Sequence, residues 1–302
     1  MDFLISGTHI FPVYLMVIGF VIGILGGFFG VGGSFLAGPA LFAFGMPMNF
    51  VVGTDLAHIV GKSIVAAMKH RTLGNVDIKL GTIMVVGTIA GVETGAQGIQ
   101  YLKRHENIDI VVGIGFIVVL VSIAALLAWE SHRTRKLVKN TNTQTEEDVS
   151  AFAHVSKRIH RFHLPPMISL PTSGIKQVSL WAILAVSFVG GAFSGFLGGG
   201  AGYIRMPLLV FLLGVPTHVA VGTDLFEIII SAGYGTFSHA LKGNVDIMVA
   251  LVMHTGAAIG AQIGATLTQY FRGPKIRMAF VPLPLIGAGL VIYSLLTGQH
   301  FK

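Results

Sequence analysis

The chain has 302 residues, of which 53% are hydrophobic and only 11% are charged, and its mean hydropathy is +0.78. This balance excludes an ordinary soluble protein and predicts a polytopic membrane protein, because several apolar runs approach or exceed the roughly 20 residues that span a bilayer. The net charge of +7 does not indicate a nucleic-acid partner, since many basic residues lie in one polar loop, where they act as a topology signal. The chain contains no cysteine, which excludes disulfides and thiolate metal sites.

The first half of the chain is a series of apolar segments, and no basic stretch precedes the first of them, so we expect no cleaved signal peptide. The segments are expected at about 11–29, 34–46, 48–69, 79–102 and 108–129. The second would reach only about 20 Å as a helix, which is less than the roughly 30 Å hydrocarbon core. It is therefore a half-helix, a re-entrant arm or a crossing in a thinned region.

A polar stretch from Glu130 to Gln177 separates the two halves, and its basic ends predict that it lies on the cytoplasmic side of the plasma (inner) membrane. The apolar segments of the second half are expected at about 179–197, 203–213, 217–241, 247–271 and 278–297. The predicted domains are a first transmembrane repeat (1–130), a cytoplasmic linker (131–178) and a second transmembrane repeat (179–302).

The two halves share one set of motifs, which returns after about 168 residues. The matching stretches are 26–33 with 195–202, 53–56 with 222–225, and 74–78 with 243–247. Both copies of the first motif are rich in glycine, and prolines follow each copy. A duplicated apolar unit with broken helices is how secondary transporters build a site at the middle of the membrane. We therefore predict an all-α membrane protein made of two homologous repeats of four or five membrane segments each.

The order of these motifs resembles the sulfite exporter TauE/SafE family of membrane permeases over nearly the whole chain except about residues 130–178. The resemblance implies a transporter that exports a small sulfur-containing anion, with sulfite or an organosulfonate as the lead substrate. Family members often carry Thr-Ser where this chain has Thr54-Asp55 and Thr223-Asp224. That departure leaves the substrate open.

The relative orientation of the repeats depends on the short apolar arm in each half. If the arm crosses the membrane, each repeat has five crossings and the halves are inverted; if it is re-entrant, each has four and the halves are parallel. We favour inversion, because only opposite orientations bring two matching glycine-rich elements together from opposite faces at the bilayer centre.

Charged residues at membrane depth mark the predicted site, because each costs roughly 2.5–3.5 kcal/mol to insert unpaired. They are Asp55, Lys62, Glu93, Arg205, Asp224 and Glu227. On a helix, Asp55, His58 and Lys62 would share one face. In the second repeat the cation is Arg205, where the first repeat has Ala37. Each cation either pairs with a carboxylate to make burial tolerable or faces a cavity.

We predict an anion site between the two glycine-rich hairpins, where backbone N–H groups and the ends of half-helices favour an oxyanion. The candidate substrate-binding residues are Gly32, Gly33, Thr54, Lys62, Gly200, Ala201, Arg205 and Thr223. The candidate proton-coupling residues are Asp55, His58, Asp224 and Glu227. Two alternatives stay open: the glycines serve only close helix packing, and the two threonines cap the backbone. Asn75, Asp77, Asn244 and Asp246 occupy matching turns before long apolar segments and are predicted to be structural, because Asn and Asp favour helix caps.

Other classes of function are less well supported by the sequence. The glycine hairpins lack the Gly-Lys-Ser/Thr ending of a nucleotide-binding loop, and no catalytic triad or His-x-x-x-His pair recurs, so we expect no enzyme activity, no cofactor and no metal site. The expected partners are a small anion and the lipid bilayer, with a homodimer as the commonest oligomer. A divalent-cation transporter, or a regulatory membrane module that works through its linker, are the alternatives.

Overall fold

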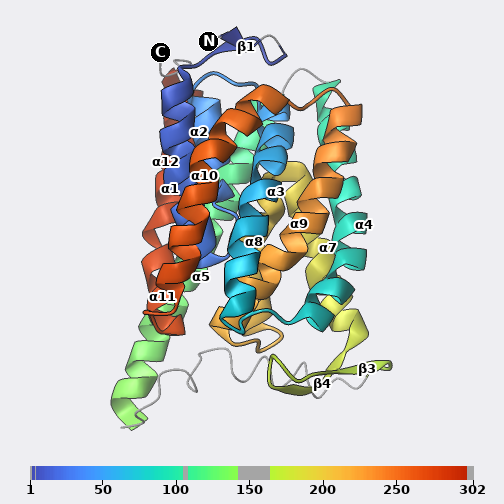
Figure 1. Cartoon of the computed structure of the whole chain (residues 1–302), viewed down its shortest axis with the longest axis vertical. Coiled ribbons are helices and arrows are strands. Elements are labelled where there is room, and N and C mark those ends of the chain that lie inside the picture. The colour runs from blue at the N-terminus through green and yellow to red at the C-terminus, as the bar shows by residue number, and fades with distance from the viewer. Residues whose placement is uncertain (1, 4, 105–107, 142–163, 298–302) are drawn as a thin grey trace.

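The computed structural model describes residues 2–3, 5–104, 108–141 and 164–297, which form a bundle of helices with a small β-hairpin at each end (Figure 1). The elements of the first half are β1 (Asp2–Phe3), β2 (Thr8–His9), α1 (Pro12–Phe29), α2 (Ser34–Ala43), α3 (Met48–Thr72), α4 (Ile78–Lys103) and α5 (Ile108–Thr141). Those of the second half are β3 (Met167–Leu170), β4 (Ile175–Ser179), α7 (Leu180–Leu197), the 3₁₀ turn η1 (Gly199–Ala201), α8 (Gly202–Phe211), α9 (Thr217–Leu241), α10 (Ile247–Thr268), α11 (Gly273–Phe280) and α12 (Pro282–Thr297).

The helices confirm a polytopic all-α membrane protein. Among the described residues, seven helical stretches are long and apolar enough to cross a membrane. The 25-residue helix α9 carries the buried carboxylates Asp224 and Glu227 and is not in that set. The helices α2 and α8, of 10 residues each, are the two short arms expected from the sequence.

Helix starts follow the predicted capping. The Asp77 carboxylate accepts a hydrogen bond from the Leu80 N–H at 3.0 Å, and the Asp246 carboxylate accepts from the Val249 N–H at 3.3 Å. Each aspartate satisfies a backbone donor that the first helical turn leaves without a partner. The capping prediction is therefore confirmed for Asp77 and Asp246, whereas Asn244 Oδ1 accepts hydrogen bonds from Asn49 and Lys103.

Three segments differ from the expectation. The helix α5 does not end near residue 129 but continues to Thr141, and β3 and β4 pair antiparallel inside the stretch expected to be linker. The last apolar segment is divided into α11 and α12 at Pro282, a residue that has no N–H to continue a helical ladder. The remainder of the predicted linker, 142–163, lies outside the described residues.

Helices of one half pack on helices of the other: α1 lies against α10, α4 against α7 and α3 against α9. Glycines bring the backbones into contact, since a Cβ on Gly19 would lie 2.0 Å from the Met253 carbonyl oxygen and one on Gly191 would lie 2.3 Å from that of Thr88. The glycines of α1, α10, α4 and α7 therefore do serve close helix packing.

Matching helices enter the bundle from opposite ends (Figure 1). The strands β1 and β2 precede α1 at one end, which we call the terminal face, and β3 and β4 precede α7 at the other, which we call the linker face. An inverted repeat requires matching helices to begin at opposite faces, as α1 and α7 do. The inverted repeat itself stays an interpretation of the sequence.

Candidate functional site

The two glycine hairpins, Gly30–Gly33 and Gly198–Ala201, meet inside the bundle. A Cβ on Gly32 would lie 3.2 Å from the Gly199 carbonyl oxygen and 3.5 Å from Ile59, which stands near the middle of α3. Gly32 and Gly200 have φ angles of 66° and 70°, which L side chains rarely adopt. The predicted encounter of the two glycine-rich elements is therefore present in the structure.

The hairpins also place helix starts inside the bundle. The N-cap of α2 is Gly33, and no side chain caps this helix start. The first N–H groups of a helix and its dipole favour an anion. The position of Gly33 thus fits its predicted role, although a helix start alone does not make a site.

Arg205 lies on α8 and binds two carboxylates of α9. Its Nε donates to Asp224 Oδ1, its Nη1 lies 2.5 Å from Glu227 Oε2, and Nη1 is also 3.4 Å from the Thr88 hydroxyl of α4. We call Arg205, Asp224, Glu227 and Thr88 the arginine cluster, and all four are fully buried. Arg205 is therefore paired with carboxylates rather than facing a cavity alone, and the two carboxylates leave this cluster with one unit of formal negative charge.

A second charged group lies on α3, as the i, i+3, i+7 spacing predicted. His58 Nδ1 is 3.5 Å from Asp55 Oδ1 and 3.3 Å from Lys62 Nζ. We call these three residues the lysine cluster; all are buried. The His254 ring of α10 lies close to Gly61, beside Lys62. This cluster has one formal cation and one formal anion, so it is neutral when His58 is neutral.

Several atoms of these clusters are buried without a hydrogen-bond partner. They are Asp55 Oδ2, His58 Nε2, Arg205 Nη2, Asp224 Oδ2 and Glu227 Oε1. Buried polar atoms are almost always hydrogen-bonded, and leaving one unpaired costs about 1–3 kcal/mol. A concentration of such atoms around two charge clusters indicates a place that a polar ligand, a proton or water completes.

Tyr203 is a member of this site that the sequence reasoning missed. It lies on α8 two residues before Arg205, its side chain is fully buried, and its hydroxyl has no hydrogen-bond partner. The Asp55 carboxylate is close enough to interact electrostatically with that hydroxyl. The repeats carried a usable signal: Tyr203 stands where the first half has Phe35, as Arg205 stands where it has Ala37.

The two threonines predicted to contact substrate are engaged with the backbone. Thr54 Oγ1 accepts a hydrogen bond from the Asp246 N–H, and Thr223 Oγ1 accepts from the Asp77 N–H, each at 2.9 Å. These bonds correspond to the alternative prediction, in which the threonines cap the backbone. Each threonine, however, caps a backbone N–H of the other half of the chain. Each oxygen is used, while each hydroxyl hydrogen stays available to donate.

Glu93 stands apart from both clusters. It forms a salt bridge with Lys242 at 3.2 Å and accepts from the Ser238 hydroxyl at 2.6 Å, and its side chain is 31% exposed. Glu93 is therefore paired, as expected for a charge on an apolar helix, and its cation Lys242 directly follows the end of α9. Within the described part of the chain, no group of three or more His, Asp or Glu residues is arranged to hold a metal ion.

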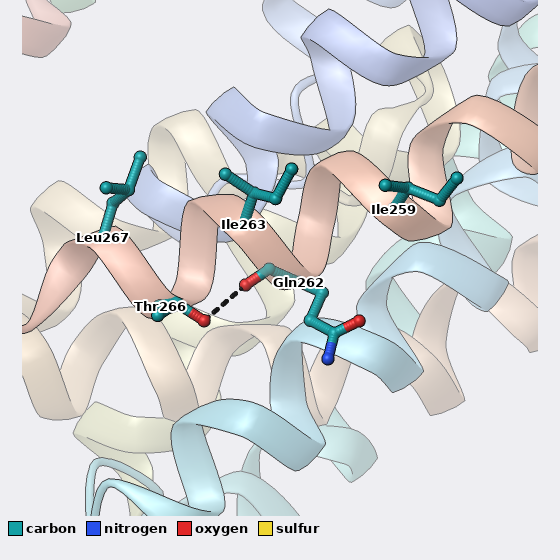
Figure 2. A pocket seen from close by; sticks show the side chains of 5 residues that line it. All are labelled: Ile259, Gln262, Ile263, Thr266 and Leu267. Atoms are coloured by element: carbon teal, nitrogen blue, oxygen red, sulfur yellow. Dashed lines mark hydrogen bonds between the residues drawn. The ribbon is translucent and has the colours of Figure 1, made fainter.

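A separate recess of about 340 Å³ lies on α10 and is shown in Figure 2. Its lining residues are Ile259, Gln262, Ile263, Thr266 and Leu267. The isoleucines are among the exposed apolar residues of the molecule, and the Thr266 hydroxyl is turned back to the Gln262 carbonyl at 2.7 Å. None of the predicted site residues lines this recess.

The sequence matches the family model described as sulfite exporter TauE/SafE over residues 15–291. The chain belongs to the TauE/SafE family. Two relatives that align along nearly their whole length are from Bacillus subtilis. The probable membrane transporter protein YunE is 26% identical over 92% of this chain and 97% of its own, and the probable membrane transporter protein YjnA is 24% identical over 93% and 97%. A shorter match, 33% identical over 29% of this chain and 36% of its own, joins it to the probable membrane transporter protein MJ0441 of Methanocaldococcus jannaschii.

No solved structure matches the chain significantly. The family and its relatives show a multi-pass membrane transporter. Membership of a family of transporters is consistent with the expectation from the sequence that the chain is not an enzyme.

Proposed function

We propose that this TauE/SafE protein is a secondary permease for a small sulfur-containing anion, with sulfite or an organosulfonate as substrate and export as its direction. The observation that carries the proposal is the fully buried Arg205 guanidinium, whose Nη2 has no hydrogen-bond partner. Its partner Asp224 lies next to the second glycine hairpin, since a Cβ on Gly202 would lie 2.7 Å from Asp224 Oδ2. A planar guanidinium binds an oxyanion such as a sulfonate through paired N–H donors.

The two carboxylates on Arg205 make proton coupling the natural mechanism. An anion can replace Glu227 or Asp224 on the guanidinium once that carboxylate has taken up a proton. A monovalent anion and a proton entering together leave the charge of the arginine cluster unchanged, which keeps the electrostatic cost of the buried state low. The proposed cycle therefore moves one proton with each anion.

The lysine cluster offers a second contact. Lys62 is buried with Asp55 and His58, and the Asp55 carboxylate interacts electrostatically with the unpartnered Tyr203 hydroxyl of α8, the helix that also carries Arg205. In the proposed site, Tyr203 donates to the anion while Lys62 adds charge. Alternating access follows from one set of helices moving against the other around this fixed centre.

The distribution of basic residues supports an orientation with the linker face toward the cytoplasm of the cell. In the described chain, the elements that meet this face are the end of α3, the start of α4, the end of α5, β4 and the start of α11 (Figure 1), and they contain or adjoin Lys69, Arg71, Lys79, Arg133, Lys176, Arg272 and Lys275. The ends of α4 and α9, at the terminal face, contain or adjoin Lys103, Arg104 and Lys242. Positive charge favours the cytoplasmic side of bacterial inner membranes. Export would then run from the linker face to the terminal face.

The test is uptake of labelled sulfite into liposomes that contain the purified protein, with thiosulfate, sulfate and a small sulfonate as competitors. Arg205→Gln is the variant and the exposed Arg272→Gln is the matched control. We expect saturable uptake in wild type and Arg272→Gln, inhibition by one competitor, and loss of uptake in Arg205→Gln. Sulfite uptake no faster than in empty liposomes would remove sulfite as a substrate.

A further inference from the structure

Each half of the chain begins with a β-hairpin, and the two hairpins make the same contact at opposite faces. In the β1–β2 hairpin, the Ser6 hydroxyl donates to Asp246 Oδ2 at 2.7 Å. In the β3–β4 hairpin, the Ser173 hydroxyl donates to Asp77 Oδ2 at 2.6 Å. Ser6-Gly7 and Ser173-Gly174 occupy matching places, and both glycines have positive φ, 70° and 67°.

Each contact joins the two halves of the molecule. Asp246 caps α10 of the second half and receives Ser6 from the first, whereas Asp77 caps α4 of the first half and receives Ser173 from the second. The carboxylates of both aspartates are therefore shared between a helix start and a hairpin of the other half. A movement that separates the halves at one face must break the Ser–Asp bond of that face.

The bonds continue inward to the charge clusters. The Asp246 N–H donates to Thr54, the residue before Asp55, and the Asp77 N–H donates to Thr223, the residue before Asp224. One chain of contacts thus runs from the terminal face to the lysine cluster, and another from the linker face to the arginine cluster. Each face is connected to one cluster.

We propose that the two hairpins are paired latches that control access from the two faces, with Ser6–Asp246 closing the terminal face and Ser173–Asp77 closing the linker face. Both latches are formed in this structure while both clusters are fully buried, which is the arrangement of an occluded state. A recess of about 650 Å³ lies beside the β3–β4 hairpin, between Ser173–Gln177 and Gly214. This recess leaves space into which the β3–β4 hairpin can move when the Ser173–Asp77 bond breaks.

The direct test uses amide hydrogen exchange of the protein in lipid nanodiscs, because this readout needs no substrate. Ser173→Ala should raise exchange in the first part of α9, around Thr223, about fivefold for the loss of one hydrogen bond, and leave the first part of α3 unchanged. Ser6→Ala should do the reverse. Ser173→Thr keeps a hydroxyl and should restore protection, and the exposed Thr172→Ala is the control.

Exchange that rises equally at both helix starts, or at neither, would overturn the latch proposal. A second arm rests on the proposed function: in vesicles of one orientation, Ser173→Ala should raise the KM measured from the terminal face about fivefold, and Ser6→Ala should lower it. Equal KM values in both variants and wild type would also count against the latches. Absence of transport in wild type, with the exchange contrast intact, would overturn the proposed anion transport and leave the latches supported.

Discussion

At the scale of single residues, the site depends on a guanidinium that is held by two carboxylates in a fully buried setting. Removing one partner of a buried ion pair typically costs about 3–5 kcal/mol, because the other charge stays buried without compensation. We expect Arg205→Gln to lower thermal stability in detergent by an amount of that order, and Arg205→Lys to rescue it only in part, since an ammonium cannot reproduce the guanidinium fork.

The control for that prediction neutralises the partners as well. Arg205→Gln combined with Asp224→Asn and Glu227→Gln removes the uncompensated charge, so the triple variant should unfold at a higher temperature than Arg205→Gln alone. Equal unfolding temperatures for the single and triple variants would contradict the prediction, because they would show that uncompensated charge is not the cause of the lost stability.

Tyr203→Phe separates function from stability. The hydroxyl has no partner in the structure, so its removal should leave the unfolding temperature unchanged or slightly higher. If it donates to the bound anion, anion uptake should fall about 10-fold or more, as for a hydrogen bond to a charged group. Uptake by Tyr203→Phe at the wild-type rate would remove this residue from the site.

At the scale of elements, the glycine hairpins owe their shape to positive φ angles and to close contact. Gly30 has φ 72° and a Cβ there would lie 2.5 Å from Val221 Cα, whereas Gly74 has φ 74° and nothing within 4 Å. An alanine at either position costs about 1–2 kcal/mol for the left-handed conformation, and only Gly30→Ala adds overlap, worth about 1–3 kcal/mol more. We expect thermal unfolding to show a larger loss of stability for Gly30→Ala than for Gly74→Ala. Equal losses of stability would show that the backbone of the hairpin moves to accommodate the added methyl group.

The cross-connections of α3 and α9 give a second test at this scale. Thr223→Val keeps the shape but removes the acceptor of the Asp77 N–H, which should cost about 1–3 kcal/mol of stability. The exposed Thr82, which bonds only within its own helix to Ile78, is the matched position, and Thr82→Val should change stability by less than about 0.5 kcal/mol. Comparing the unfolding temperatures of the two variants decides whether the hydrogen bond between Asp77 and Thr223 stabilises the packing of the two halves.

At the scale of the whole molecule, apolar run lengths, glycine and proline positions and Asp caps were enough to predict nearly every helix, because these signals are local. The charged face of α3 was also predictable, since Asp55, His58 and Lys62 lie within two turns of one helix. The pairing of Arg205 was not, because it joins α8 to α9 and α4. Nor were the hairpin contacts of Ser6 and Ser173, which link residues more than about 90 positions apart.

The same limit applies to two other contacts between distant parts of the chain. The partners of Glu93 were not predictable, because Ser238 of α9 and Lys242, which follows that helix, lie 145 and 149 positions away along the chain. Within the predicted linker, β3 and β4 pair antiparallel with a register shift between Ile168 and Leu170, and the Lys79 ammonium at the start of α4 donates to the Ser169 carbonyl. The composition of a segment indicates how much of it is exposed to solvent. It does not indicate which distant element of the chain the segment contacts.

The most direct test of the central claim measures anion and proton movement together in liposomes. A small sulfonate is the right probe, because it stays ionised across the working pH range, so any proton that moves must be carried through the protein. We predict that sulfonate flux is accompanied by proton flux in the same direction, rises as pH falls, and disappears in Arg205→Gln but not in Arg272→Gln. Sulfonate flux without proton movement, or flux that Arg205→Gln leaves unchanged, would contradict an anion site built on Arg205 and its two carboxylates.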